Sequence, residues 1–266
     1  MRKNATEPQL HDPRAGKDFV ASLEKGLDVL GCFSRQHAKL TLSEVARLTA
    51  TSPASARRSL STLRTLGYLD SDGKRFWLAP RVLLLANAYL TSRPTPGLAQ
   101  PLLDALSERT RQSASLGKLV GEDVIIIARS TARRSLTTGL GVGSRLPAYC
   151  SALGRVLLAS LPAEEARRRL RAMDRPALSA STVHELDAVL EQVERCRRDG
   201  WARSDGELES GVRSMAVPVS NRAGATVAAL SISVRAERLS MSEFRDAFLP
   251  QLLVARDTLA ERLHAE

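Results

Sequence analysis

A segment without acidic residues, from Ser52 to Leu66, carries side chains that suit contact with nucleic acid. Arginine forms paired hydrogen bonds with guanine edges, and hydroxyl groups bind phosphate oxygens or base edges. At helical spacing the apolar residues fall on one face and the basic and hydroxyl residues on the opposite arc. The alternative is a basic face that contacts only solvent, and Arg64, nearer the apolar side, is expected to be structural or to contact phosphate. We expect DNA contacts from Ser52, Ser55, Arg57, Arg58, Ser61 and Thr62.

A second group of residues suits the binding of a small organic acid. Ser151, Ala152 and Leu153 begin a predicted helix that Gly and Pro residues precede, and the unpaired backbone N–H groups of such a helix start bind anions. Arg145 is expected to hold a carboxylate with its forked guanidinium group, with a surface ion pair as the alternative. Two residues, Tyr149 and Met215, are expected to form apolar walls around the ring of an aromatic ligand.

The sequence contains no recognisable catalytic or metal-binding motif. Its histidines are far apart and form neither an HExxH motif nor a ligand cluster. They are His11, His37, His184 and His264. Ser151 does not lie in a GxSxG motif, and the glycines at 139, 141 and 143 lack the third glycine of a dinucleotide fingerprint. The three cysteines are widely spaced, which excludes a CxxC site and favours buried thiols. We therefore expect a protein that is not an enzyme and that needs no metal or cofactor.

The elements that would position the DNA-contacting residues form a predicted winged helix-turn-helix domain over residues 19–79. After a first amphipathic helix, Thr41 and Glu44 fit a capping box that starts a second, short helix. Ser52 followed by Pro53 is a strong start for the third helix. A turn signal then predicts a hairpin, the wing. Two wing residues, Lys74 and Arg75, are expected to reach the DNA backbone or the minor groove.

A second domain is predicted over residues 94–266, after a linker helix at 80–93. Its helices alternate with β-rich runs, which is typical of an α+β domain with helices flanking an antiparallel sheet. Strands are predicted at 115–120, 124–129, 136–142, 201–204, 213–219 and 226–234. Helices are predicted at 98–111, 151–161, 163–172, 185–199 and 242–263.

Charge and composition agree with a nucleic-acid partner. The net charge is +10, and residues 1–92 carry 14 Lys and Arg against 8 Asp and Glu. Such basic surfaces attract phosphate polyanions. Residues 1–18 mix charge, Pro and Gly without the apolar run of a secretory signal, so we expect a disordered start and a cytoplasmic protein. No stretch approaches the roughly 18 apolar residues that a membrane span needs, so no membrane partner is expected.

Three segments make the chain resemble the IclR family of bacterial transcription regulators over nearly its whole length. The first comprises LEKGLDVL at 23–30, LSEVA at 42–46 and RRSLSTL at 57–63. The second is GSRLPAYCSALGRVLLA at 143–159, and the third is DGELESGVRSMAVPV at 205–219. The last two are similar to the PcaR and PobR branch of the family, which regulates protocatechuate, 4-hydroxybenzoate and β-ketoadipate catabolism.

The resemblance implies a GAF-like α+β effector domain, a homodimer or dimer of dimers, and control of transcription by a small carboxylate. It also implies that Ala152 and Leu153 offer backbone groups to the effector. The side chains that it assigns to the effector site are Asp205, Ser214, Ser231 and Ser233. For each serine the alternative is a strand hydroxyl that faces water.

The expected function is therefore a DNA-binding regulator that responds to an aromatic or dicarboxylic acid and controls catabolic genes. Its expected partners are promoter DNA, the acid, further copies of the chain and RNA polymerase. The alternatives are an IclR-type regulator of another carbon-source pathway, a DNA binder without an effector, and an enzyme fused to a DNA-binding module. Activators and repressors share these motifs.

Overall fold

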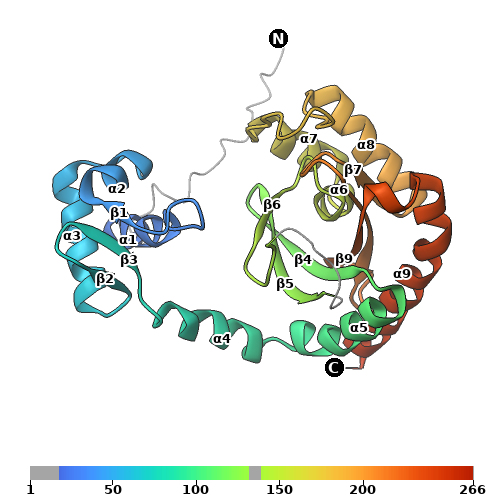
Figure 1. Ribbon diagram of the computed structural model, residues 1–266, viewed down its shortest axis with the longest axis horizontal. Helices are drawn as coiled ribbons and strands as arrows, with labels where there is room; N and C mark the ends of the chain where they lie inside the picture. Colours follow the sequence, from blue (N-terminus) through green and yellow to red (C-terminus); the bar gives the residue numbers. More distant parts are fainter. Residues whose placement is uncertain (1–17, 132–138, 266) are drawn as a thin grey trace, which may run out of the picture. The chain divides into compact units, whose positions relative to one another are not determined.

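The computed structural model describes residues 18–131 and 139–265 of the chain (Figure 1). The chain forms two compact units, Met1–Tyr89 and Leu90–Glu266, which are described separately. The segment predicted as a linker helix contains a helix, α4 (Val82–Ser92). Except for Asp18, the residues predicted to form a disordered start lie outside the described part.

The first unit has the predicted winged helix-turn-helix fold. Its elements are α1 (Ala21–Gly31), β1 (Leu40–Thr41), α2 (Leu42–Leu48), α3 (Pro53–Thr65), β2 (Leu69–Ser71) and β3 (Arg75–Leu78). The strands form an antiparallel sheet in the order β1-β3-β2, in which the short β1 was not predicted. A buried core of apolar residues from the three helices and the sheet, Val29, Leu40 and Leu60 among them, holds α3 with its polar arc outward.

The two predicted helix starts of this unit are present. The Thr41 hydroxyl accepts a hydrogen bond from the Glu44 amide, and the Glu44 carboxylate accepts one from the Thr41 amide. The hydrogen bonds that the Thr41 amide and hydroxyl donate to the Glu44 carboxylate hold the pKa of Glu44 below its usual value. The Ser52 hydroxyl likewise accepts a hydrogen bond from the Ser55 amide, with Pro53 at the first helical position. Because these caps satisfy backbone groups that a helix start leaves free, they fix where α2 and α3 begin.

The second unit is built around a six-stranded antiparallel sheet in the order β6-β5-β4-β9-β8-β7. The strands are β4 (Ser113–Val120), β5 (Asp123–Ser130), β6 (Arg145–Pro147), β7 (Ala202–Asp205), β8 (Val212–Ser220) and β9 (Thr226–Arg235). The helices are α5 (Pro94–Thr110), α6 (Ala152–Ala159), α7 (Ala163–Ala172), α8 (Leu186–Asp199), the short 3-10 helix η2 (Ala236–Arg238) and α9 (Met241–His264). The α+β class is therefore confirmed.

The strand predicted at 136–142 is the main correction to the predicted elements. Residues 136–138 lie outside the described part, and residues 139–142 form no strand. Instead, β6 follows this segment and pairs with β5, with Leu146 opposite Val124. Glycine is unfavourable within strands, and Gly143 adopts a φ of 85° that suits a turn. The glycines at 139, 141 and 143 therefore make a connection that leads into the edge strand.

The sheet separates two layers of buried apolar side chains. On one face α5 and α9 cover a core that includes Leu103, Met215 and Leu252. On the other face α6, with α7 and α8 outside it, covers a core that includes Ile126 and Val156 (Figure 1). Because side chains alternate along each strand, the long strands β5, β8 and β9 contribute to both layers.

Close contact between α6 and the segment before it depends on glycine at position 154. A Cβ atom placed on Gly154 would lie 2.2 Å from the Ala148 carbonyl oxygen and 2.3 Å from the Ala148 Cα. These are backbone atoms of a buried segment, so they cannot move aside as the end of a flexible side chain can. The first turn of α6 therefore lies directly on the chain that leads into it.

Gly154→Ala is expected to lower the free energy of unfolding by about 2 kcal/mol or more, because the methyl group would overpack buried backbone. Chemical unfolding of the full chain, followed by circular dichroism, measures the change. The matched control is Gly97→Ala in α5, where a Cβ meets no atom within 4 Å. Equal stability of the two variants would contradict this account of the α6 contact.

Candidate functional site

The exposed face of α3 carries most of the residues predicted to contact DNA. Arg57, Arg58, Ser61 and Thr62 are exposed, and Ser55 is half-buried. Ser52 is exposed as well, but its hydroxyl caps the helix. On the wing, Lys74 and Arg75 are exposed. The Asp72 carboxylate accepts hydrogen bonds from the amides of both wing residues and so shapes the turn that presents them.

The α3 residues divide between two grooves. Arg57, Ser61 and Arg64 line one groove together with Lys74 of the wing and the N-terminal end of α2. The other predicted contacts, Ser55, Arg58 and Thr62, line a second groove beside α1. The spacing of three and four residues from Arg57 to Arg64 places these side chains on one stripe of the helix. Arg64, predicted to be structural or to contact phosphate, thus lies on the same stripe as two predicted contacts.

The first groove has the electrostatics of a phosphate or base-edge site. Three cationic side chains line it, those of Arg57, Arg64 and Lys74, and no acidic side chain does. Its volume is about 550 Å³. A cationic groove between a helix and a wing suits the backbone and edges of a DNA groove.

In the second unit, serine side chains line a cavity on the sheet face beneath α6. Ser204, Ser214 and Ser233 lie directly opposite one another on β7, β8 and β9. One row along, Ser231 of β9 lies opposite Ser115 of β4. All five line the same cavity. Of the predicted effector residues, the cavity therefore brings together Ser151, Ala152, Leu153, Ser214, Ser231 and Ser233.

The start of α6 closes one side of this cavity. The Ser151 hydroxyl accepts a hydrogen bond from the Gly154 amide at 3.1 Å and caps the helix. Ala152 and Leu153 occupy the first two helical positions, where amides have no partner within the helix. Their N–H groups are therefore available to an acceptor in the cavity.

Arg129 is the cationic residue of the cavity wall, and it is not among the predicted effector residues. It lies near the end of β5, and its Nη1 donates a hydrogen bond of 2.5 Å to the Ser115 hydroxyl. Its Nε atom is buried and has no hydrogen-bond partner among the described residues. Burial lowers the pKa of Arg129, because a low-dielectric environment disfavours the charged form. No sequence motif marks it, since Arg129 simply follows the apolar run of β5.

Four residues predicted to bind an effector do not line the cavity. The Arg145 side chain is exposed and pairs with Asp123. The hydroxyl of the buried Tyr149 donates a hydrogen bond to the Pro176 carbonyl, and Met215 belongs to the opposite layer under α5 and α9. The fourth, Asp205, forms an ion pair with Arg213. Strand alternation explains both Asp205 and Met215, whose neighbours Ser204 and Ser214 face the cavity instead.

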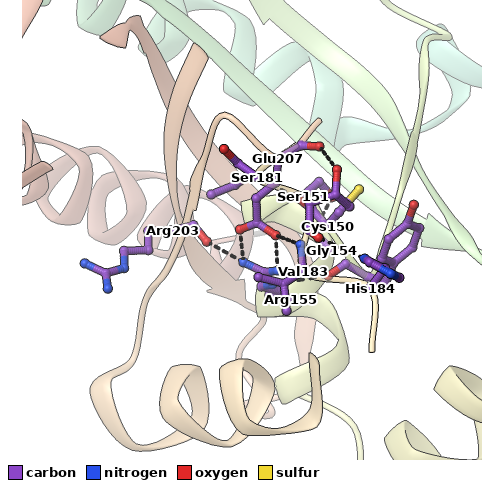
Figure 2. A network of polar contacts seen from close by, with 12 residues as sticks. Cys150, Ser151, Gly154, Arg155, Ser181, Val183, His184, Arg203 and Glu207 are labelled. Atoms are coloured by element: carbon purple, nitrogen blue, oxygen red, sulfur yellow. Dashed lines mark hydrogen bonds and ion pairs between the residues drawn. The ribbon is translucent and has the colours of Figure 1, made fainter. Parts of the chain in front are cut away.

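A buried ion pair supports the wall of the cavity (Figure 2). Both Arg155 guanidinium Nη atoms donate to the Glu207 carboxylate at 2.6 Å. The Arg155 side chain also donates to the carbonyl groups of Tyr149 and Arg203. Glu207 in turn accepts a hydrogen bond of 3.1 Å from the Val183 amide. The pair thereby joins α6, β7 and the segment before α8 to the 206–211 loop, which contributes two further residues of the cavity wall, Leu208 and Glu209.

Two cysteines of the second unit are buried and poorly suited to act as nucleophiles. Burial raises the pKa of Cys150 to about 11 and that of Cys196 to about 12, so both thiols stay protonated. Within residues 18–131 and 139–265, no group of His, Cys, Asp and Glu could hold a metal ion. None of the helices described there is both long and apolar enough to cross a membrane.

Comparison with known proteins decides the family. The IclR helix-turn-helix domain matches residues 22–73, and the C-terminal domain of bacterial IclR transcriptional regulators matches residues 87–260. The chain belongs to the IclR family. It is therefore a DNA-binding transcriptional regulator and not an enzyme.

Within the IclR family, the chain is related to regulators of aromatic-acid catabolism. It is 40% identical to the Pca regulon regulatory protein of Pseudomonas putida, over 92% of this chain and 85% of that protein. A crystal structure of a putative transcriptional regulator from Rhodococcus sp. RHA1 is 41% identical, with a TM-score of 0.76, over 92% of this chain and 98% of that one. The inducer-binding domain of an Acinetobacter PobR double mutant, solved with 3-hydroxybenzoic acid, is 30% identical, with a TM-score of 0.59, over 62% of this chain and 97% of that one.

Glu207→Gln is expected to lower the free energy of unfolding by about 3–5 kcal/mol, because it leaves the Arg155 guanidinium buried without a counter-charge. Thermal and chemical unfolding of the full chain measure the loss. Asp205→Asn serves as the control, since Asp205 is itself exposed and loss of its ion pair with the half-buried Arg213 should cost far less than loss of a fully buried pair. A Glu207→Gln variant as stable as that control would refute the structural role of the pair.

Proposed function

We propose that this IclR-type regulator controls catabolic genes in response to an aromatic or dicarboxylic acid that binds the serine-lined cavity. The observation that carries the proposal is the buried, partnerless Nε of Arg129 in the cavity wall. A buried N–H group that lacks a hydrogen-bond acceptor is costly. A carboxylate that enters the cavity offsets this cost and completes the hydrogen bonding of the guanidinium group.

The opposite part of the cavity favours a second polar group on the acid. The row of Ser204, Ser214 and Ser233 lies on strands away from β5, which bears Arg129. The Ser204 hydroxyl donates to the Cys150 carbonyl at 2.9 Å and keeps its lone pairs for a ligand donor. An acid whose carboxylate meets Arg129 therefore gains from a hydroxyl or second carboxylate at its far end. Hydroxybenzoates, protocatechuate and β-ketoadipate have this form, and the resemblance to Pca and PobR regulators favours them.

Binding of such an acid requires the cavity to widen. Its volume is about 60 Å³, whereas an engineered cavity of about 150 Å³ binds benzene. The part of the 206–211 loop beyond Glu207 is the wall that we propose to move, because Glu209 lines the cavity and, like Ser210, is exposed to solvent. An effector with different affinity for the narrow and wide forms shifts the balance between them. This shift is the event that we propose to be transmitted through the linker helix to the DNA-binding unit.

The DNA partner of the proposed regulator is a pseudo-palindromic promoter site. Arg57, Ser61 and Lys74 are proposed to contact the DNA from the first groove, and Arg64 joins them. The residues of the groove beside α1, Ser55, Arg58 and Thr62, are proposed to contact the flanking backbone. RNA polymerase is a further proposed partner once the regulator is bound at the promoter. These contacts are proposed to be made in the cytoplasm.

Self-association is proposed because two helices expose apolar side chains. On α1, Leu23 and Leu27 are exposed, and on α4 Leu83, Leu84 and Leu85 are exposed. A helix face of this kind is normally covered by another protein surface. A homodimer, or a dimer of dimers, covers these faces and pairs two DNA-binding units.

Arg129→Gln is expected to abolish stabilisation by the acid, because the amide keeps a hydrogen-bonding group but loses the charge. Thermal-shift titration of the full chain tests this with 4-hydroxybenzoate, protocatechuate, β-ketoadipate and short 2-oxo acids, since a ligand of the native state raises the melting temperature. The wild-type protein should show a saturable rise with a hydroxybenzoate or with β-ketoadipate. Arg145→Gln, outside the cavity, should keep it.

Two outcomes of this titration contradict the proposal. A shift in the Arg129→Gln variant equal to that of the wild type would remove the assigned anchor. No shift of the wild-type protein with any of these acids would favour a regulator of another carbon-source pathway, or a DNA binder without an effector.

Arg57→Ala is expected to weaken specific DNA binding about tenfold or more, because one arginine contact to a base edge contributes about 1–3 kcal/mol. Fluorescence anisotropy measures the affinity for a duplex selected by this protein from a random-sequence pool, at fixed salt concentration. Arg198→Ala on α8 removes the same charge from the other unit and should leave the affinity unchanged. Equal losses in both variants would reveal only a general charge effect.

A further inference from the structure

A second cavity of the effector unit, distinct from the serine-lined one, is rich in arginine. It has a volume of about 270 Å³ and lies where α8, β7 and the first turn of α9 meet. Arg195, Arg203 and Arg245 line it, one from each of these elements, and Arg155 lies in its wall. Trp201, half-buried, provides an apolar surface. We propose that this cavity binds a small doubly charged anion, a phosphate ester or a dicarboxylate, as a second effector site.

Three of the arginines have side chains that a ligand can recruit. Arg203 has no hydrogen bond or ion pair from its guanidinium group within the described residues, and Figure 2 shows this side chain pointing away from the Arg155–Glu207 pair. Arg195 and Arg245 pair with Glu191 and Asp246. Those pairs are solvent-exposed and hence weak, so exchanging the acidic partner for a bound anion costs little.

The buried Arg155 gives the cavity a fixed hydrogen-bond donor. Of the five N–H groups of a guanidinium, Arg155 uses four, toward Glu207, Tyr149 and Arg203. One Nη2 hydrogen has no partner in the part of the chain that the structure describes. The side chain is 1% exposed and is held by these bonds, so a ligand meets a pre-oriented donor.

The lining also indicates the rest of the ligand. Asp199 and Gln192 supply acceptors, which suit hydroxyl groups, while Trp201 suits a short carbon chain. A volume of about 270 Å³ holds a molecule of metabolite size. The expected ligand is a small polar metabolite with two negative charges, because three arginines that a ligand can recruit and one fixed donor line the same cavity.

The position of Arg155 links this cavity to the serine-lined one. Arg155 lies in the wall of the arginine-rich cavity, and its partner Glu207 belongs to the loop that carries Leu208 and Glu209 into the serine-lined cavity. A ligand that engages Arg155 therefore acts on the loop whose movement the first effector requires. The binding claim itself does not depend on the proposed function, since it rests on the arginine-rich cavity alone.

The test is a calorimetric titration of the full chain with pyrophosphate and, separately, with succinate, at constant ionic strength. We expect saturable binding of at least one probe, and the tighter one shows whether the cavity prefers phosphate groups or a pair of carboxylates. Arg203→Gln combined with Arg245→Gln should weaken this binding at least about tenfold, because two charge-assisted contacts are lost. The control combines Arg198→Gln with Arg262→Gln, which removes two exposed charges outside the cavity and should leave the affinity unchanged.

A second comparison separates this site from the first effector cavity. Arg129→Gln should keep the affinity for pyrophosphate or succinate, even if it abolishes the response to hydroxybenzoates. The proposal is overturned if neither probe binds the wild-type protein, if the Arg203/Arg245 variant binds as tightly as the wild type, or if its loss is matched by the Arg198/Arg262 control.

Discussion

The buried ion pair of Arg155 and Glu207 is the interaction on which the arrangement of the effector unit depends. Two charges removed from water are tolerated only when they have an opposite charge and further hydrogen-bond partners. Arg155 finds them in Glu207 and in the carbonyl groups of Tyr149 and Arg203, and Glu207 finds another in the Val183 amide. These partners belong to segments far apart in sequence, so the pair fixes how they meet. Both cavities of the unit border on it, one through Arg155 and the other through the loop that follows Glu207.

Because side chains alternate along the strands, one face of the sheet forms an apolar core and part of the other face lines a cavity. Met215 faces the apolar layer under α5 and α9, which gives the unit its stability, while Ser214 next to it faces the cavity. Small hydroxyl side chains leave space beneath α6, and glycine at position 154 lets that helix approach closely. The cavity therefore exists because the strands place serine, rather than a larger apolar residue, on this part of the sheet. In the proposed function, Arg129 supplies the charge that makes the cavity selective for an acid.

The sequence predicted the features that depend on local physics. The helix starts at Ser52 and Thr41 are predictable because capping is a short-range pattern. The resemblance to the family points to Ser214, Ser231 and Ser233, but not to Ser115 or Ser204 of the same cavity. Register was harder, since a shift of one residue exchanges the faces of a strand, and Asp205 was therefore chosen where Ser204 lines the cavity. Arg129 and the arginine-rich cavity were missed for a different reason. Their partners come from separate elements, and no spacing in the chain reveals such a convergence.

The central claim is that an acid held by Arg129 changes the affinity of the DNA-binding unit for its promoter. The most direct measurement is the dissociation constant of the promoter complex with and without a saturating hydroxybenzoate, for the wild type and for Arg129→Gln. Linkage requires that an effector coupled to DNA binding alters this constant, typically about 5–150-fold. The account predicts such a change in the wild type and none in the variant. An unchanged constant in the wild type, or the same change in both proteins, would contradict it.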